Sequence, residues 1–155
     1  MPTPPRDLRD WIALLERAGE LRRISAEVDP DLEITEIVDR LQKAGGGPAL
    51  LFENPKGSEH PLLINQFGTE KRMCMAFGVE SLDDAAAKLG DILDMQPPEG
   101  IRQKVRGLLK LKSVADSRPK SVSKAPCQEI VLEGNRVDLG QLPIQRCWPG
   151  DPAPF

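Results

Sequence analysis

Residues 21–52 read LRRISAEVDPDLEITEIVDRLQKAGGGPALLF and carry the pattern of a strand, a helix and a second strand. Apolar and polar side chains alternate over residues 21–28, which predicts a half-buried strand. Residues 32–44 place apolar side chains at helical spacing, and residues 49–52 are a continuous apolar run that fits a strand buried on both faces. A helix between two strands favours the α/β fold class.

Shorter elements on both sides extend this unit into a small domain. Helical spacing and short apolar runs are again the signals. The expected elements are a strand over residues 62–65 and helices over residues 7–18, 71–77, 82 up to the stop at Pro97, and 101–111. The sequence therefore predicts an N-terminal α/β domain over residues 1–112.

The composition changes after this domain. Residues 113–125 are rich in serine and lysine, which is typical of a linker. Residues 126–155 suggest the incomplete start of a β-rich domain, with a strand over residues 129–132 and a returning strand over residues 137–139. The last residues show no helical or strand period and contain Pro143, Pro149, Pro152 and Pro154.

Composition bounds the class of protein. The chain has 155 residues, a formal net charge of −3, 39% hydrophobic residues and 29% charged residues, as in a water-soluble globular protein. No apolar run approaches the ~20 residues that a membrane-spanning helix needs. Residues 1–6 lack the apolar core of a signal peptide. We therefore expect a cytoplasmic protein without an integral membrane segment.

The cysteine and histidine content excludes several kinds of site. Cys74, Cys127 and Cys147 lie far apart in the sequence, which supports neither a disulfide framework nor a zinc ribbon. His60 is the one histidine, so histidine-based metal sites and Ser-His-Asp triads lack their residues. We expect His60 in a surface loop and Cys74 in the core.

Three motifs invite a chemical interpretation, and each has a simpler one. The Gly-Gly-Gly-Pro run at residues 45–48 follows a predicted helix and precedes a strand, which reverses the order of a phosphate-binding loop and favours a helix end. Lys56 could present its amine to an anion, but an exposed turn over residues 54–57 is favoured. A solvated helix face, rather than an acid–base pair, is favoured for Glu33, Glu36, Asp39 and Arg40.

Residues 102–124 form a strongly basic segment with a single acid, Asp116. Such a segment could bind phosphate backbones. It has no interleaved aromatic residues and the chain is acidic overall, so an exposed linker, or a surface that docks acidic regions of the same protein, is favoured. Its basic side chains are Arg102, Lys104, Arg106, Lys110, Lys112, Arg118, Lys120 and Lys124.

Several phrases follow one another in the order seen in one protein family. They read DLRD, GELRRI, VDP, LEITEI, GGPALLFENPKG, NQFGT, APCQ and CWP, at residues 7–10, 19–24, 28–30, 32–37, 46–57, 65–69, 125–128 and 147–149. The chain resembles the N-terminal part of the UbiD family of decarboxylases and is similar to the 3-octaprenyl-4-hydroxybenzoate carboxy-lyase of ubiquinone synthesis. This resemblance extends over nearly the whole chain.

The resemblance implies a decarboxylase of aromatic or α,β-unsaturated acids that uses prenylated FMN, with Mn²⁺ and K⁺. It implies a soluble homo-oligomer in which a split β-barrel holding the flavin follows the α/β domain. The catalytic, cofactor-binding and metal-binding residues of the family follow the CWP phrase, beyond Phe155. No catalytic, cofactor or metal residue is therefore assigned to this chain. Its expected partner is the remainder of its own polypeptide, and the 155 residues alone are expected to be inactive.

Two other hypotheses stay open. The chain could be a stand-alone binding or assembly module derived from this domain, without catalysis, that docks through residues 102–124 or through its proline-rich end. It could also be a nucleic-acid-binding module that uses the same basic segment. That hypothesis predicts an affinity that falls steeply with added salt.

Overall fold

A computed structural model describes residues 4–93, 118–119 and 121–154. The chain divides into two compact units. The first contains Met1–Leu82 and Asp138–Phe155, and the second contains Asp83–Val137. The predicted helix over residues 101–111, and residues 113–117 and 120 of the predicted linker, lie outside the described residues.

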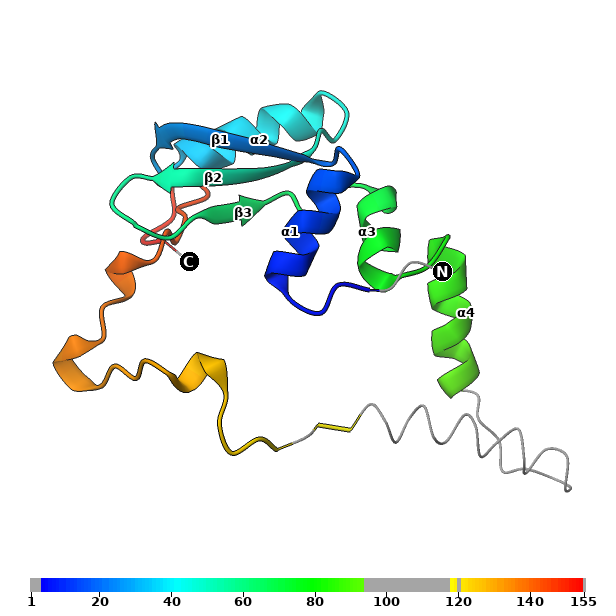
Figure 1. The fold of residues 1–155 in the computed structure, drawn as a ribbon. Coiled ribbons are helices and arrows are strands. Elements are labelled where there is room, and N and C mark those ends of the chain that lie inside the picture. Colours follow the sequence, from blue (N-terminus) through cyan, green and yellow to red (C-terminus); the bar gives the residue numbers. More distant parts are fainter. Residues whose placement is uncertain (1–3, 94–117, 120, 155) are drawn as a thin grey trace, which may run out of the picture. The chain divides into compact units, whose positions relative to one another are not determined.

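A three-stranded sheet organises the first unit (Figure 1). The strands are β1 (Leu21–Val28), β2 (Ala49–Pro55) and β3 (Leu62–Ile64), and their spatial order follows the sequence. β1 pairs with β2 in parallel, and helix α2 (Glu33–Lys43) connects the two, whereas β2 pairs with β3 antiparallel. The expected α/β unit over residues 21–52 is confirmed.

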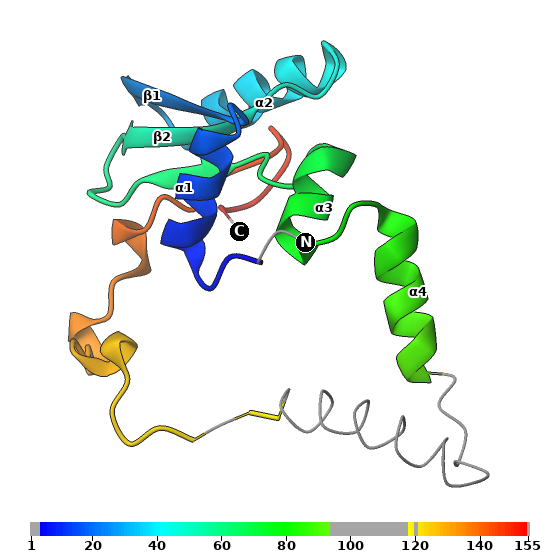
Figure 2. The same ribbon diagram turned by 45° about the vertical axis from the view of Figure 1, so that its right-hand side comes forward.

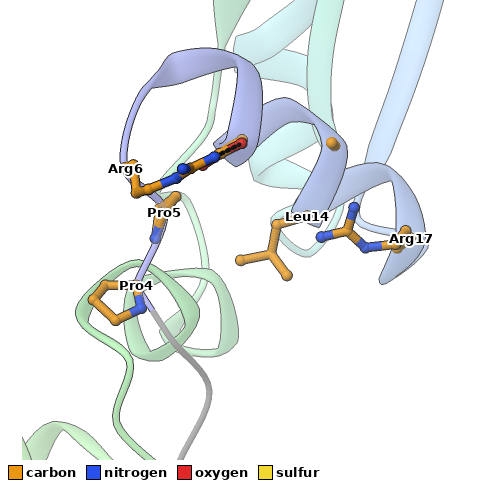
Figure 3. Close-up of a pocket in the computed structure, with 7 residues that line it drawn as sticks. Pro4, Pro5, Arg6, Leu14 and Arg17 are labelled. Atoms are coloured by element: carbon orange, nitrogen blue, oxygen red, sulfur yellow. Dashed lines mark hydrogen bonds and ion pairs between the residues drawn. The ribbon is translucent and has the colours of Figure 1, made fainter.

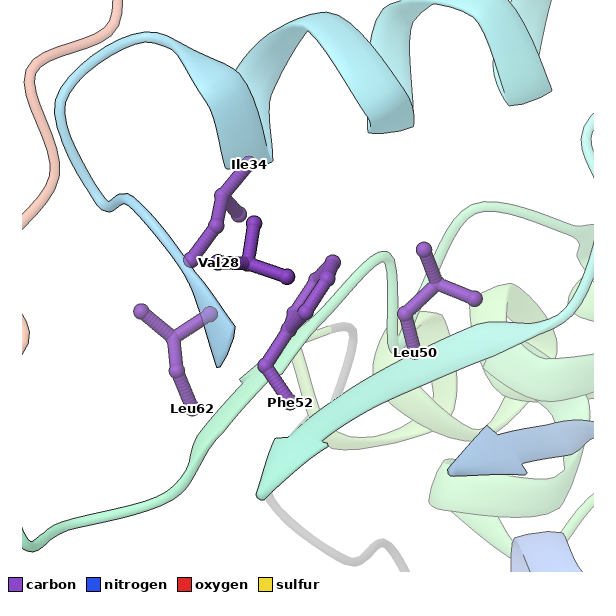
Figure 4. Close-up of a cluster of buried hydrophobic side chains, with 5 residues drawn as sticks. All are labelled: Val28, Ile34, Leu50, Phe52 and Leu62. Atoms are coloured by element: carbon purple, nitrogen blue, oxygen red, sulfur yellow. The ribbon is translucent and has the colours of Figure 1, made fainter. Parts of the chain in front are cut away.

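Helices cover both faces of this sheet (Figures 1 and 2). On one face α2 packs over a buried cluster that consists of Val28, Ile34, Leu50, Phe52 and Leu62 (Figure 4). On the other face lie α1 (Leu8–Arg17) and α3 (Glu70–Phe77), whose cluster is centred on Trp11, Leu15 and Ala49. Helix α2 covers one face of the sheet, and α1 and α3 cover the other. Both faces of the central strand are therefore buried, as expected, at Ala49, Leu50, Leu51 and Phe52.

Side-chain caps explain where two helices begin. The Asp7 carboxylate accepts a hydrogen bond from the backbone N–H of Asp10 and so caps α1, which begins at Leu8. Thr69 caps α3 in the same way through the N–H of Arg72. Gly78, with φ 64°, ends α3 in the left-handed conformation that glycine adopts without a steric penalty.

Three local expectations about this unit are wrong. Ala26 is exposed, because a bulge between Ile24 and Glu27 interrupts the alternation of β1. β2 continues to Pro55, so the first half of the expected turn over residues 54–57 belongs to the strand. Leu32 lies outside α2, because its φ of 69° is incompatible with a right-handed helix.

Helix α4 (Leu82–Leu93) forms as expected, but the largest difference from the expected structure lies further along the chain, over residues 129–139. The strand expected over residues 129–132 and its return over residues 137–139 are wrong, because short 3-10 turns and irregular backbone replace them. An isolated strand leaves its backbone groups unpaired, and the described residues offer no second strand there. Ile130, Val131 and Leu132 are exposed instead of packed.

Candidate functional site

Two groups of interacting polar side chains in the first unit lie at the two ends of its sheet. The amino end is where β1 and β2 begin, after Glu20 and Pro48. The carboxyl end is where they finish, at Val28 and Pro55. In α/β sheets the carboxyl ends of parallel strands are the usual place for a ligand.

Arg72 is the centre of the amino end. Its side chain is 0% exposed, although it begins in the polar first turn of α3. Its Nη1 donates to Glu20 Oε2 at 2.9 Å and to the backbone carbonyl of Gly47 at 2.8 Å. Lys71 Nζ lies 2.6 Å from the other Glu20 oxygen. The hydrogen bond from Lys71, followed by that from Arg72, holds the pKa of Glu20 below its usual value, against the opposing effect of burial.

Asn65 completes this network beside the glycine run. Its Nδ2 donates to the carbonyls of Gly46 and Pro48, both at 2.9 Å, and its Oδ1 accepts from Gln42 Nε2. Asn65 has φ 58°, a conformation that asparagine tolerates better than most residues. The network of Glu20, Lys71, Arg72 and Asn65, called here the amino-end network, fixes how the helices enter the sheet. Its hydrogen bonds join these side chains to one another, to Gln42 and to carbonyls of the glycine run, which indicates a structural role.

The carboxyl end holds a different set of charges. Lys56 Nζ lies 2.8 Å from Asp29 Oδ2, and this contact lowers the pKa of Asp29 and raises that of Lys56. Arg146 reaches back from the end of the chain to Asp31, with Nε at 2.6 Å from Oδ1 and Nη2 at 3.0 Å from Oδ2. Ser58 Oγ donates to the carbonyl of Gln141 at 2.7 Å. Residues 138–154 thus lie on the end of the sheet where an α/β protein would place a ligand (Figure 1).

Two shallow pockets accompany these features. The first, of about 300 Å³, lies beside the Asp31–Arg146 pair and is otherwise lined by Ile144, Ala153 and three prolines. The second, of about 240 Å³, lies on the outer side of α1 between Pro4, Pro5, Leu14 and Arg17 (Figure 3). Asp10, in its wall, is already paired with Arg6 at 2.7 Å. Neither pocket presents an unpaired acid and base for catalysis.

Of the sequence-predicted candidates, the structure brings Glu33 and Lys56 together, because both contact Asp29. Gly45, Gly46 and Gly47 have positive φ and connect α2 to β2, so the helix-end interpretation is confirmed. Lys56 is exposed at the turn after β2, as expected, and is in addition an ion-pair partner of Asp29. His60 is exposed and Cys74 is buried, also as expected.

The charges of α2 form the solvated face that the sequence favours. Glu36 pairs with Arg40 at 2.7 Å and Asp39 with Lys43 at 2.6 Å, one helical turn apart. Glu33 accepts a hydrogen bond from the N–H of Asp29 and so caps the turn before the helix. These carboxylates are engaged within α2 and its first turn, and no acid–base pair results.

Sequence reasoning missed the residues that matter most to this unit. Glu20, Asn65 and Arg72 carry no local signal of burial, because Arg72 follows Glu70 and Lys71 in what reads as an exposed first turn. Asp31 and Arg146 lie 115 residues apart, so no spacing rule joins them. The one usable signal was Asn65, an asparagine that directly follows a short strand and is followed by a turn sequence.

Among the described residues, no group of three or more His, Cys, Asp or Glu could hold a metal ion. The glycine run follows a helix and lies next to the amino-end network, so it does not precede a helix N-terminus as a phosphate-binding loop does. Within the same part of the chain, no helix is long and apolar enough to cross a membrane.

Residues 12–92 match the family described as the 3-octaprenyl-4-hydroxybenzoate carboxy-lyase N-terminal domain. The chain belongs to the UbiD family. Residues 119–155 match the 3-octaprenyl-4-hydroxybenzoate carboxy-lyase Rift-related domain. The chain is therefore the N-terminal region of a UbiD-family protein, together with a segment that matches the next domain.

Solved UbiD-class structures support the same assignment. An evolved dimeric form of the enzyme HmfF from Pelotomaculum thermopropionicum, in complex with prFMN, is 29% identical with a TM-score of 0.66 over 95% of this chain and 29% of that chain. The vanillic acid decarboxylase of Sedimentibacter hydroxybenzoicus is 25% identical in its closed form, with a TM-score of 0.63 over 92% of this chain and 27% of that chain. The chain thus spans less than a third of the length of these UbiD-class enzymes.

Proposed function

We propose that this chain is the N-terminal portion of a prenylated-FMN-dependent decarboxylase that removes CO₂ from an aromatic or α,β-unsaturated acid. The observation that carries the proposal is the order of the two family matches. Residues 12–92 match the N-terminal domain and residues 119–155 match the domain that follows it. The prFMN complex of HmfF, at 29% identity, supports the choice of cofactor.

The proposed domain organisation places an α/β domain at residues 1–112, a linker at residues 113–125 and the start of a split-barrel flavin domain at residues 126–155. Exposed apolar side chains support this view of the last segment. Ile130 is 78% exposed and Trp148 is 64% exposed. Side chains of this size are normally buried, so we propose that the remainder of the same polypeptide covers them.

The proposed chemistry lies downstream. The catalytic residues, the flavin contacts and the ligands of Mn²⁺ and K⁺ would follow Phe155, and no step of decarboxylation is assigned to the residues of this chain. Prenylated FMN would supply the site at which the acid becomes activated for loss of CO₂. The 155 residues would then be inactive alone, and the whole protein would be a cytoplasmic homo-oligomer related to the carboxy-lyase of ubiquinone synthesis.

The first test is the intact mass of the native protein from its source, compared with the 17.1 kDa of this chain. A mass about three times larger would agree with the length of the solved relatives, of which this chain covers 29%. Purified native protein should then show a bound flavin spectrum and release CO₂ from aromatic acids. A native mass near 17.1 kDa would contradict the proposal and favour the binding or assembly module.

The second test concerns the fragment. The 155-residue chain, incubated with prenylated FMN, Mn²⁺ and K⁺, should neither retain the flavin on gel filtration nor release CO₂ from a panel of aromatic acids. Retention of flavin together with turnover would overturn the proposed location of the active site. A salt-dependent shift of a labelled oligonucleotide would instead favour the nucleic-acid hypothesis.

A further inference from the structure

The last part of the chain joins the start of α2 through main chain and side chain together. Asp31 and Arg146 form an isolated parallel β-bridge. The N–H of Leu32 donates to the carbonyl of Arg146 at 3.1 Å, and the N–H of Arg146 donates to the carbonyl of Pro30 at 3.2 Å. The two side chains add a forked ion pair at 2.6 and 3.0 Å, the geometry in which an arginine binds a carboxylate most specifically.

The backbone beneath this bridge is strained. Leu32 has φ 69° and ψ −34°, and the N–H of Glu33 donates to the carbonyl of Asp31 at 2.9 Å. Together these describe a γ-turn centred on Leu32, a conformation that is rare for a residue with a Cβ atom. Strain of this kind persists only where the surroundings hold it in place.

The other acidic side chains around the turn have partners of their own, and the Asp31 carboxylate pairs with Arg146. Asp29 accepts from the N–H of Asp31 and pairs with Lys56, and Glu33 accepts from the N–H of Asp29. Within the described residues, the recorded partner of the Asp31 carboxylate is Arg146. The pair is partly exposed, at 54% for Asp31 and 30% for Arg146, so it can open without unfolding the core.

We propose that Asp31 and Arg146 are positioning residues that fasten the entry of the downstream domain to the carboxyl end of the α/β sheet, and that the γ-turn at Leu32 is held in its strained form by this contact. The identity of that downstream domain rests on the proposed function. The contact surface is formed by residues 30–32 together with Ser58, and its occupant is residues 141–146 of the same chain.

Amide hydrogen exchange on the intact 155-residue chain tests the pair directly. Arg146→Met should speed exchange at the N–H groups of Leu32 and Arg146 by about three- to tenfold, as expected for loss of a good surface ion pair. Exchange at Phe52, in the central strand, should stay the same. Arg40→Met removes a more exposed ion pair from α2, that with Glu36, and should leave exchange at Leu32 and Arg146 unchanged.

Two further variants separate attraction from strain. The exchanged pair Asp31→Arg with Arg146→Asp should restore most of the protection that either single change removes. Leu32→Gly removes the cost of the positive φ, so exchange at Arg146 should slow by about tenfold. Unchanged exchange in Arg146→Met, or failure of the exchanged pair to restore protection, would overturn the role of the ion pair. Unchanged exchange in Leu32→Gly would overturn the role of strain.

These measurements involve neither flavin nor substrate. A protein that lacked decarboxylase activity could still show the full pattern of exchange, and an active enzyme could fail to show it. The exchange experiment therefore tests the positioning contact independently of the proposed function.

Discussion

The two ends of the sheet contain the same kind of contact, an arginine on a carboxylate, in opposite surroundings. At the amino end, Arg72 is fully buried against Glu20, which is 18% exposed. At the carboxyl end, Arg146 and Asp31 remain 30% and 54% exposed. A buried charge is costly when its partner is removed, whereas a solvated pair is worth little. The comparison indicates that the amino end determines stability and the carboxyl end determines position.

Glu20→Gln should be the most damaging change. It leaves the buried Arg72 charge without its carboxylate, and the expected loss in free energy of unfolding is about 3 kcal/mol. Urea denaturation followed by circular dichroism measures it. Glu53→Gln is the control, because Glu53 pairs with Arg23 on the surface and should cost less than about 1 kcal/mol.

Arg72→Met sharpens this result. It removes the buried charge together with Nε and Nη2, which have no hydrogen-bond partner among the described residues. Glu20 keeps Lys71 as its partner. The variant should therefore lose only about 1–2 kcal/mol. If it proved less stable than Glu20→Gln, the assignment of the stability cost to an unpaired buried charge would be wrong.

Asn65→Ala should lower the free energy of unfolding by about 2–3 kcal/mol. It leaves the carbonyls of Gly46 and Pro48 without their hydrogen bonds, and it forces a positive φ on alanine, which disfavours it. Asn65→Gly separates these causes. Glycine tolerates the φ of 58° but cannot bond Gly46 or Pro48. It should recover about 1 kcal/mol of the loss, again measured by urea denaturation, and equal stability of the two variants would exclude a backbone contribution.

Acid should weaken the amino end. The pKa of Glu20 lies below its usual value of 4.5 in the folded chain. Its contribution to stability is therefore present above the unfolded pKa and is lost as the pH falls through the lower, folded pKa. The midpoint of urea unfolding, measured from pH 7 down to pH 3, should fall, and less steeply in Glu20→Gln. Parallel curves for the two proteins would contradict the role of Glu20.

The smallest effect is expected at the carboxyl end. Arg146→Met should change the free energy of global unfolding by less than about 1 kcal/mol, even though it weakens the contact with Asp31, because both side chains are partly solvated. The same urea measurement serves here. A loss as large as that of Glu20→Gln would remove the distinction between the two ends.

Local pattern was enough to predict the sheet and its helices. The alternation of a strand and the spacing of a helix can each be recognised from a few neighbouring residues, and residues 21–52 contain a complete strand, helix and strand. Prediction was wrong where the local structure depends on a pairing partner or on an irregularity of the backbone. The strand over residues 129–132 needs a neighbour to accept its hydrogen bonds, and Ala26 is exposed by a single bulge.

The polar contacts were the least predictable feature. Arg72 is buried because Glu20 and the carbonyl of Gly47 happen to converge from two distant loops. Arg146 finds Asp31 across 115 residues. The family could be identified from short phrases in order, because their residues recur together irrespective of what each contacts. The catalytic site remains a prediction based on that resemblance.

The long separation between Asp31 and Arg146 also bears on the order of events during synthesis. The sheet and its three covering helices are complete by Leu82. At ~5–20 residues added per second, the ribosome needs roughly 3–13 s more to reach Arg146. For that interval the nascent α/β core has its hydrophobic clusters but lacks the segment that closes its carboxyl end. Leu32 is then free to leave its γ-turn until Arg146 has been synthesised and the contact with Asp31 can form.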